Sequence, residues 1–188
     1  MTEEYYKKKI KRRNMLLKQC YEEINFLKQE LIKYKKAALT DSLTKLNNRR
    51  ALENISNYDS IILGDIDHFK KINDKYGHIT GDLILIDISS ILQKIVRDSD
   101  LVCRWGGEEF VILLKNCSEM DAYDKSIQLK NEISKLSKKY GFNITMSFGV
   151  TTLKNNTLKT AIEHADEAMY ISKEKGRNTV TIYKLINN

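Results

Sequence analysis

The chain has 188 residues, 41% of them hydrophobic, and a net charge of +7. This length and composition suit one folded domain with an appendage and exclude a chain that is disordered throughout. No apolar run is long enough to span a bilayer, and the N-terminus is charged rather than signal-like, so we expect no membrane span. Cys20, Cys103 and Cys117 are scattered along the chain. We interpret them as reduced thiols, which favours a cytoplasmic protein.

The positive charge lies almost wholly in the first 40 residues. They hold eleven basic and five acidic residues, a net of +6, whereas residues 41–188 carry a net of only +1. A basic segment of this kind can contact nucleic acid or an anionic membrane. A solvated helix face is the simpler interpretation and the one we adopt, so we expect no nucleic acid among the partners.

A seven-residue repeat runs through the same segment. Two series of positions form it: Ile10, Leu17, Ile24, Leu31 and Ala38, with Tyr6, Arg13, Cys20, Leu27 and Tyr34. The pattern predicts a coiled-coil helix over residues 1–39 that pairs as a parallel homodimer. The alternative is a single amphipathic helix packed on its own domain. Beyond the repeat, Thr40 or Asp41 offers a side-chain oxygen that can cap a new helix.

Residues 40–188 alternate between strand-like and helix-like patterns. The isoleucine-rich run 60–67 predicts a buried strand that ends in Asp65 and Asp67. Apolar residues recur at helical spacing over residues 81–98, which predicts a helix. The first strand is therefore expected to place two carboxylates at its C-terminal end.

Two glycines, Gly106 and Gly107, separate two further apolar runs. This pattern predicts a hairpin whose two-residue loop has positive φ at both glycines. The remaining elements are expected as helix, strand, helix and strand over residues 118–140, 143–153, 157–175 and 178–184. The fold class is therefore α/β (α+β), a ferredoxin-like or palm-type βαββαβ sheet with flanking helices, preceded by the long N-terminal helix.

Acidic side chains stand at two points that this fold can bring together. Asp65 ends the first strand, and Glu108 follows the glycines of the hairpin. Two carboxylates that face one spot repel each other unless a cation lies between them, and Mg²⁺ prefers oxygen ligands of this kind together with substrate phosphates. The alternative is that both acids are surface salt-bridge partners.

Other side chains could hold a nucleotide. Lys70 can contact phosphates, and the turn before it exposes backbone N–H groups that bind anions. Asn73 and Asp82 can recognise the edge of a base, since a carboxylate accepts from the N1 and N2 groups of guanine but finds no N1–H on adenine. Lys173 and Arg177, expected four residues apart on one helix end, could hold terminal phosphates or merely complement the helix dipole.

These motifs closely resemble those of one known family, the GGDEF domains or diguanylate cyclases. The match runs in order over about residues 40–183 and consists of "DSLTKLNNRR", "DIDHFKKINDKYGHITGD", "RWGGEEF", "SFGV" and "ADEAMYISKEKGRN". The hairpin motif is the Glu variant of the family signature. Lys45 stands where the family usually has glycine, and His68 where an aromatic residue is common. The heptad helix lies outside the match and is similar to signalling coils that precede such domains.

The resemblance implies an enzyme that condenses two GTP molecules into cyclic di-GMP and releases two pyrophosphates. Each domain would hold one GTP, and two domains would face each other. Asp65, the carbonyl of Ile66 and Glu108 would bind Mg²⁺, two ions per GTP, with Mn²⁺ as a possible substitute. Glu108 would also help to ionise the ribose 3′-OH, Lys70 would neutralise charge in the transition state, and Glu109 would lie beside the metals.

The resemblance also assigns the substrate contacts and an inhibitory site. The substrate contacts would be the backbone around His68 and Phe69 for phosphates, Asn73 and Asp82 for guanine, and Lys173 and Arg177 for the outer phosphates. Arg97 and Asp100 form an R-x-x-D motif a few residues before the hairpin. In the family this motif binds the cyclic di-GMP product and inhibits the enzyme.

Three other functions stay open. A catalytically silent receptor would bind cyclic di-GMP through Arg97 and Asp100 without turning over GTP. An adaptor would use the basic helix to contact nucleic acid or a membrane. A related enzyme would make a mixed cyclic dinucleotide, although Asp82 favours guanine.

Overall fold

The computed structural model describes residues 3–53, 55–154 and 156–183. The chain divides into two compact units, Met1–Leu39 and Thr40–Asn188. Among the described residues, no helix is both long enough and apolar enough to cross a membrane. Each unit is described separately below.

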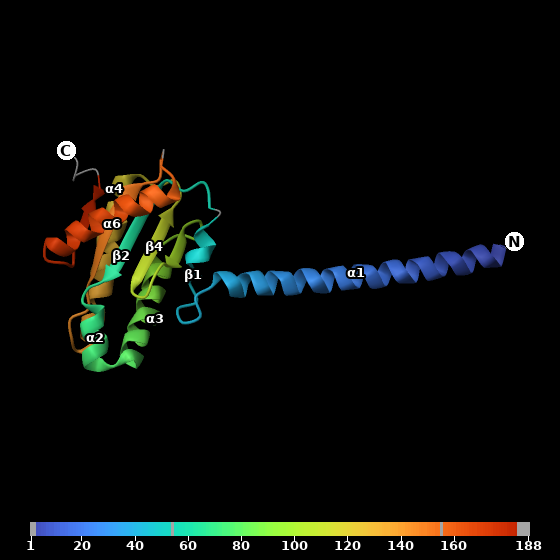
Figure 1. Cartoon of the computed structure of the whole chain (residues 1–188), viewed down its shortest axis with the longest axis horizontal. Helices are drawn as coiled ribbons and strands as arrows, with labels where there is room; N and C mark the ends of the chain where they lie inside the picture. The colour runs from blue at the N-terminus through green and yellow to red at the C-terminus, as the bar shows by residue number, and fades with distance from the viewer. Residues whose placement is uncertain (1–2, 54, 155, 184–188) are drawn as a thin grey trace. The chain divides into compact units, whose positions relative to one another are not determined.

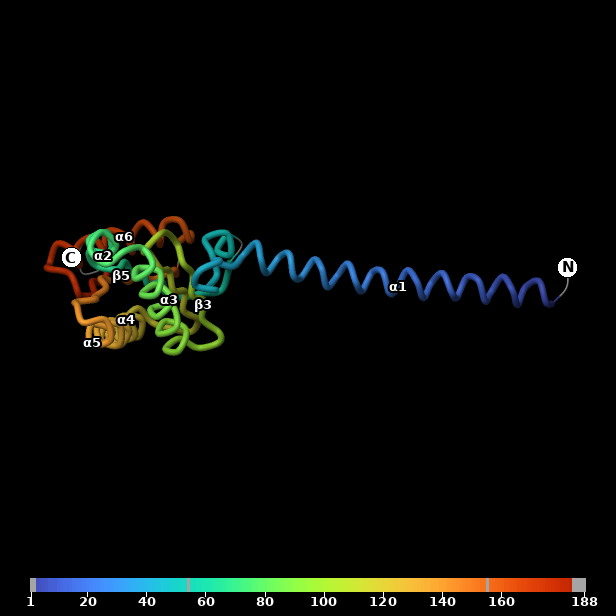
Figure 2. The backbone as a smooth tube through the Cα atoms, turned by 90° about the horizontal axis from the view of Figure 1, so that it is seen from below, coloured from blue at the N-terminus to red at the C-terminus, as the bar shows by residue number. Residues whose placement is uncertain are grey.

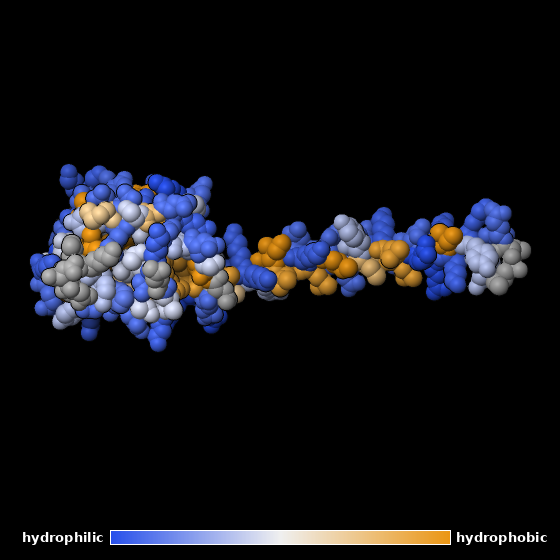
Figure 3. Space-filling view, turned by 90° about the horizontal axis from the view of Figure 1, so that it is seen from above, coloured by the Kyte–Doolittle hydropathy of each residue, from blue (hydrophilic) through white to orange (hydrophobic). Residues whose placement is uncertain are grey.

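The first unit is a single helix, α1 (Glu3–Leu39), with no buried residue. The side chains of the seven-residue repeat are open to solvent, as Figure 3 shows for the apolar residues along this helix: Ile10, Leu17 and Ile24 are 49%, 60% and 48% exposed. A row of apolar side chains in water is unfavourable, because each loses the free energy that burial would provide. The helix therefore presents a surface suited to a partner.

No helix begins at Thr40 or Asp41, so that expectation is wrong. The Asp41 carboxylate instead accepts hydrogen bonds from the backbone N–H (2.8 Å) and hydroxyl (2.7 Å) of Thr44, which closes a turn. Side-chain bonds of this kind compete with helix formation. The short strand β1 (Asn47–Asn48) and the 3₁₀-helix η1 (Arg49–Leu52) follow, and the Asn48 side chain caps η1.

The second unit is built on one six-stranded sheet with strand order β1-β3-β4-β2-β5-β6. Its longer strands are β2 (Ser60–Ile66), β3 (Leu101–Arg104), β4 (Glu109–Leu114), β5 (Met146–Thr152) and β6 (Val180–Ile182). β2 is central and runs antiparallel to both β4 and β5. Every residue of β2 is buried, which explains its continuous apolar sequence.

Helices cover both faces of this sheet (Figures 1 and 2). They are α2 (Phe69–Tyr76), α3 (His78–Ile95), α4 (Glu119–Ser134), α5 (Leu136–Tyr140) and α6 (Leu158–Glu174). Side chains of α2, α3 and α4 pack into the larger hydrophobic cluster, and those of η1 and α6 into the smaller one. In Figure 2, α6 lies on one side of the sheet and α3 and α4 on the other.

The predicted fold class is confirmed, since the sheet carries the βαββαβ order with flanking helices. The short elements β1, η1, α2 and α5 were not predicted as separate elements. The predicted hairpin forms between β3 and β4. The prediction of a two-residue loop with positive φ is wrong. Residues 105–108 separate the two strands, and neither Gly106 nor Gly107 has a positive φ.

The wider hairpin loop gives Gly106 a different role. The backbone N–H groups of Trp105 and Gly106 both donate to the carbonyl of Glu109, at 2.8 and 3.3 Å. A Cβ atom on Gly106 would lie 2.5 Å from Oε2 of Glu109. Gly106 therefore leaves the space that the glutamate carboxylate occupies.

Candidate functional site

Three acidic residues meet where β2 ends and β4 begins. The strand register places Asp65 directly opposite Glu109, and side chains that are opposite in neighbouring strands lie on the same face of a sheet. Glu108 precedes β4 in the hairpin loop. The N–H of Ile66 donates to the Glu108 carbonyl (3.3 Å), which joins the end of β2 to this loop. We call Asp65, Glu108 and Glu109 the carboxylate cluster.

One lysine lies against this cluster. Lys173, in the last turn of α6, places its Nζ 2.9 Å from Oδ1 of Asp65. The Asp65 residue is only 7% exposed. A buried carboxylate needs such a partner, because burial without one is costly.

The pKa values show that one lysine does not balance the cluster. Burial raises the pKa of Asp65 above its usual value, although Lys173 opposes the shift. Burial, and then repulsion from Asp65, raises the pKa of Glu108. Burial, and then repulsion from Asp65 and Asp166, raises the pKa of Glu109, while Lys173 and Arg49 oppose it. The site therefore carries excess negative charge that a bound cation would relieve.

The cluster suits a divalent cation that is shared with a substrate. Within the described part of the chain, no group of three or more His, Cys, Asp or Glu side chains forms a metal cage made of protein alone. Mg²⁺ does not need one, because it is commonly held by one or two carboxylates together with water and substrate phosphates. Carboxylate oxygens with raised pKa values are a donor set of this kind.

Asp67, the second acid at the end of the first strand, has a structural role. Its carboxylate accepts from the hydroxyls of Thr145 and Ser147, both at 2.7 Å, and from the backbone N–H of Asn178 at 3.0 Å. The residue is 4% exposed. These bonds tie the end of β2 to β5 and to the segment that follows α6.

The predicted phosphate contacts surround the start of α2. His68 precedes this helix in a left-handed conformation (φ 57°), which turns the chain sharply out of the sheet. Phe69 is buried in the core, so it can contribute only its backbone. Lys70 is exposed on the first turn. The unpaired N–H groups of a helix start favour anions.

The predicted guanine contacts lie on neighbouring helices, Asn73 on α2 and Asp82 on α3. Within the described residues, Oδ1 of Asn73 is buried and has no hydrogen-bond partner. Gly81 leaves room for it, because a Cβ atom at that position would collide with this oxygen. An unpartnered buried oxygen is costly, so a ligand that donates to it would stabilise the site. Asp82 is exposed beside it.

Lys173 and Arg177 do not share a helix end, so that expectation is wrong. α6 ends at Glu174, and Gly176 (φ 104°) and Arg177 (φ 67°) turn the chain away in left-handed conformations. Arg177 is exposed in this turn, whereas Lys173 is paired with Asp65.

The R-x-x-D motif lies at the end of β3 away from the hairpin loop. The Asp100 carboxylate accepts hydrogen bonds from the backbone N–H groups of Arg97 (3.0 Å) and Lys115 (3.2 Å). The Arg97 side chain is exposed. Both residues line a cavity of about 350 Å³ together with Lys125 and Gln128. The cavity is therefore separate from the carboxylate cluster and rich in charged groups.

The sequence did not predict that the Arg104 side chain joins the hairpin loop to Asp41 through hydrogen bonds. The Arg104 guanidinium donates to the Gly107 carbonyl (Nη2, 2.7 Å) and to the Asp41 carboxylate (Nη1, 3.1 Å). Burial would raise the pKa of Asp41, but hydrogen bonds from Thr44 and Arg104 outweigh it and hold the pKa below its usual value. Both residues lie in the quoted motifs, yet their 63-residue separation gives no local signal that they meet.

Comparison with known proteins agrees with the motifs. The family described as "Diguanylate cyclase, GGDEF domain" matches residues 38–179. Diguanylate cyclase A of Treponema denticola is 38% identical over 130 residues, which cover 66% of this chain and 35% of that protein. Diguanylate cyclase VdcA of Vibrio cholerae is 38% identical over 172 residues, covering 84% and 51%. The chain thus spans about a third to a half of the length of these relatives.

Solved structures give the same result. The coiled coil and GGDEF domain of DgcB from Caulobacter crescentus, in complex with c-di-GMP, superposes with a TM-score of 0.78 at 28% identity, covering 90% of this chain and 98% of that one. The active GGEEF domain of a diguanylate cyclase from Vibrio cholerae has a TM-score of 0.63 at 32% identity, covering 68% and 83%. Because the family match extends over most of the sequence and the sheet agrees with these structures, the chain belongs to the GGDEF-domain diguanylate cyclase family.

Proposed function

We propose that this protein is a diguanylate cyclase that condenses two GTP molecules into cyclic di-GMP and two pyrophosphates. The observation that carries the proposal is the carboxylate cluster, which carries excess negative charge at the end of β2, shortly before α2 begins. The three cysteines are free, which fits a cytoplasmic location where GTP is available.

The carboxylate cluster would hold the divalent cations. Asp65, the Ile66 carbonyl and Glu108 would bind Mg²⁺, two ions per GTP, and Mn²⁺ could replace it. The bound ions would neutralise phosphate charge. Glu108 would accept the proton of the ribose 3′-OH. Lys70 would stabilise the charge that develops on the phosphate.

Guanine would bind between α2 and α3. Oδ1 of Asn73 would accept from the base, which satisfies an oxygen that otherwise lacks a partner in the described structure. Asp82 would accept from N1–H and the N2 amino group. Adenine offers neither donor, so a product that contains adenine would contradict this assignment.

The triphosphate would lie over the start of α2. The backbone N–H groups around His68 and Phe69 would contact it. Lys173 and Arg177 would hold its outer phosphates from two different segments, since the helix ends between them. Lys173 can do so only if it leaves Asp65.

Condensation needs two domains, because each 3′-OH must reach the other GTP's α-phosphorus. We propose that α1 pairs with α1 of a second copy and so raises the effective concentration of the two domains. The exposed seam side chains of the heptad repeat support this homodimer. We further propose that cyclic di-GMP binds at Arg97 and Asp100 and inhibits the enzyme, which the charged cavity there supports.

Glu108→Gln should abolish conversion of GTP to cyclic di-GMP in the presence of Mg²⁺, with a loss of about 10²–10⁴-fold, because the amide cannot accept the proton or hold the cation. Chromatography of the products measures this. The control is Glu132→Gln, an exposed acid on α4. Unimpaired turnover by Glu108→Gln would refute the assigned role. Tight binding of cyclic di-GMP by the unaltered protein without any GTP turnover would instead indicate a silent receptor.

Glu109→Gln should stabilise the metal-free protein at pH 7. The pKa of Glu109 is raised in the folded state, so at a pH above its unfolded value of 4.5 the folded protein binds more protons than the unfolded chain. The free energy of unfolding therefore falls as the pH rises from 4.5 through the folded-state pKa. Glutamine removes this penalty, and the gain should vanish below about pH 3, where both states are protonated. Chemical denaturation in a chelator, followed by Trp105 fluorescence, measures it. A variant no more stable than the unaltered protein at pH 7 would contradict the charge imbalance.

Ile24→Lys should separate the two copies, because a charge in the seam of a coiled coil opposes pairing. At a concentration where the unaltered protein sediments as a dimer, the variant should sediment as a monomer and its turnover should fall. Gln29→Lys adds the same charge outside the seam and should leave both properties unchanged. Equal sedimentation of the two variants would contradict pairing through α1.

Arg97→Ala should weaken inhibition by cyclic di-GMP about 10- to 100-fold, which corresponds to the loss of a charged hydrogen bond. Its turnover without product should be unchanged, because the motif lies at the far end of β3 from the carboxylate cluster. Turnover against added product measures the effect. Lys94→Ala, exposed in the last turn of α3, is the matched control. Unaltered inhibition of Arg97→Ala would place the inhibitory site elsewhere.

A further inference from the structure

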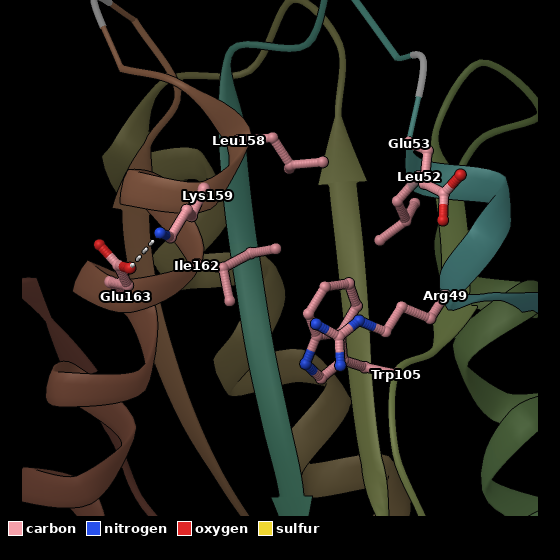
Figure 4. Close-up of a pocket in the computed structure, with 8 residues that line it drawn as sticks. All are labelled: Arg49, Leu52, Glu53, Trp105, Leu158, Lys159, Ile162 and Glu163. Carbon is pink, nitrogen blue, oxygen red and sulfur yellow. Dashed lines mark ion pairs between the residues drawn. The ribbon is translucent and has the colours of Figure 1, made fainter.

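A second cavity lies on the α6 face of the sheet. Its volume is about 430 Å³, and it is enclosed by η1, the start of the hairpin loop and the first turns of α6. Figure 4 shows Leu158 and Ile162 on the α6 side, Leu52 on the η1 side, and Arg49 over Trp105 between them. No member of the carboxylate cluster lines it, so the cavity is distinct from the proposed GTP site.

The walls of this cavity are mainly apolar. Leu52 is 1% exposed and forms the floor with Ile162, Leu158 and the indole of Trp105. The volume falls within the range of small-molecule pockets, about 300–1,000 Å³, which combine apolar walls with a few polar groups. A flat hydrophobic group could therefore be accommodated there.

The rim carries two basic and two acidic side chains, Arg49, Lys159, Glu53 and Glu163, and Arg49 is the group that could hold an anion. The Arg49 guanidinium lies 4.2 Å from the centre of the Trp105 ring, a cation–π contact that leaves its N–H donors available. No ion pair joins Arg49 to a carboxylate in the part of the chain that the structure describes. Lys159 and Glu163 are 3.9 Å apart and well exposed, so they hold each other only weakly.

We propose that this cavity binds a planar aromatic anion, with its ring against the aliphatic wall of Leu52, Leu158 and Ile162 and its acidic group on Arg49. A guanidinium suits this role, because its planar fork matches carboxylate, sulfonate or phosphate oxygens. The aromatic ring of the ligand would make the apolar contacts, and the ion pair with Arg49 would fix the orientation of the ligand.

An occupant would touch the hairpin that carries the catalytic acids. Trp105 lines the cavity, and its backbone N–H donates to the Glu109 carbonyl at 2.8 Å. Arg49 also lowers the pKa of Glu109, against the larger effects that raise it. The cavity is therefore placed to influence the carboxylate cluster, while binding itself does not depend on the proposed function.

The only tryptophan of the chain is Trp105, so its fluorescence reports directly on the cavity. The probe is 1-anilinonaphthalene-8-sulfonate, an aromatic anion. Its neutral analogue N-phenyl-1-naphthylamine lacks the sulfonate. We expect the anion to quench Trp105 saturably, and the neutral probe to bind about tenfold more weakly, as expected for one lost charged hydrogen bond.

Two variants with matched controls complete the test. Arg49→Gln and Ile162→Glu should each weaken binding of the anion about tenfold or more. The first variant loses the cation that pairs with the anion, and the second places a carboxylate in the apolar floor, where it repels the anion. Lys138→Gln and Ile79→Glu make the same changes at exposed sites on α5 and α3, and should bind as the unaltered protein does. Arg49 is exposed, so its variant keeps the test valid even if Ile162→Glu unfolds. Absence of saturable quenching, equal binding of both probes, or equal affinity in Arg49→Gln and Lys138→Gln would overturn the proposal.

Discussion

The register of β2 against β4 is the constraint on which the rest of the site depends. It sets Asp65 opposite Glu109 and therefore holds like charges together in a largely buried place. A shift of one residue would exchange the β2 side chains between the two hydrophobic clusters, moving Ile62 and Ile66 to the face where Ile61 and Leu63 pack, so the packing of the core fixes the register. The core thus provides the free energy that keeps the acids together despite their repulsion.

Polar contacts around the site fix the segments that carry it. Asp67 joins the end of β2 to β5 and to the turn after α6, and Arg104 joins the hairpin loop to Asp41. These contacts join groups of the protein itself, so they fix the backbone of the site. Preorganisation of this kind lowers the entropy that binding must overcome. Asn73 differs, because its buried oxygen has no partner among the described residues.

Much of this arrangement could be predicted from the sequence. The apolar run of β2 and the glycine-separated strands are local patterns that formed where expected, and the helical repeat of α3 formed a helix over His78–Ile95 rather than residues 81–98. The motifs then identified the family. Features that depend on the meeting of distant segments could not be predicted. The Arg104–Asp41 pair, the pocket beside Trp105 and the free oxygen of Asn73 belong to this class.

Some local predictions failed for local reasons. Asp41 bonded to Thr44 in a turn instead of capping a helix, and the Gly106–Gly107 loop widened because two N–H groups share the Glu109 carbonyl. The end of α6 was placed too late, since Gly176 and Arg177 adopt left-handed conformations. Such alternatives differ by small free energies, so local hydrogen bonds and single backbone conformations decide among them.

The Lys173–Asp65 pair would make ligand capture under the proposed function an exchange rather than a simple addition. The ammonium group compensates the Asp65 carboxylate, and it would become available for a phosphate only when another positive charge replaces it. Nucleotide and cation would then help each other to bind, since each makes a place for the other.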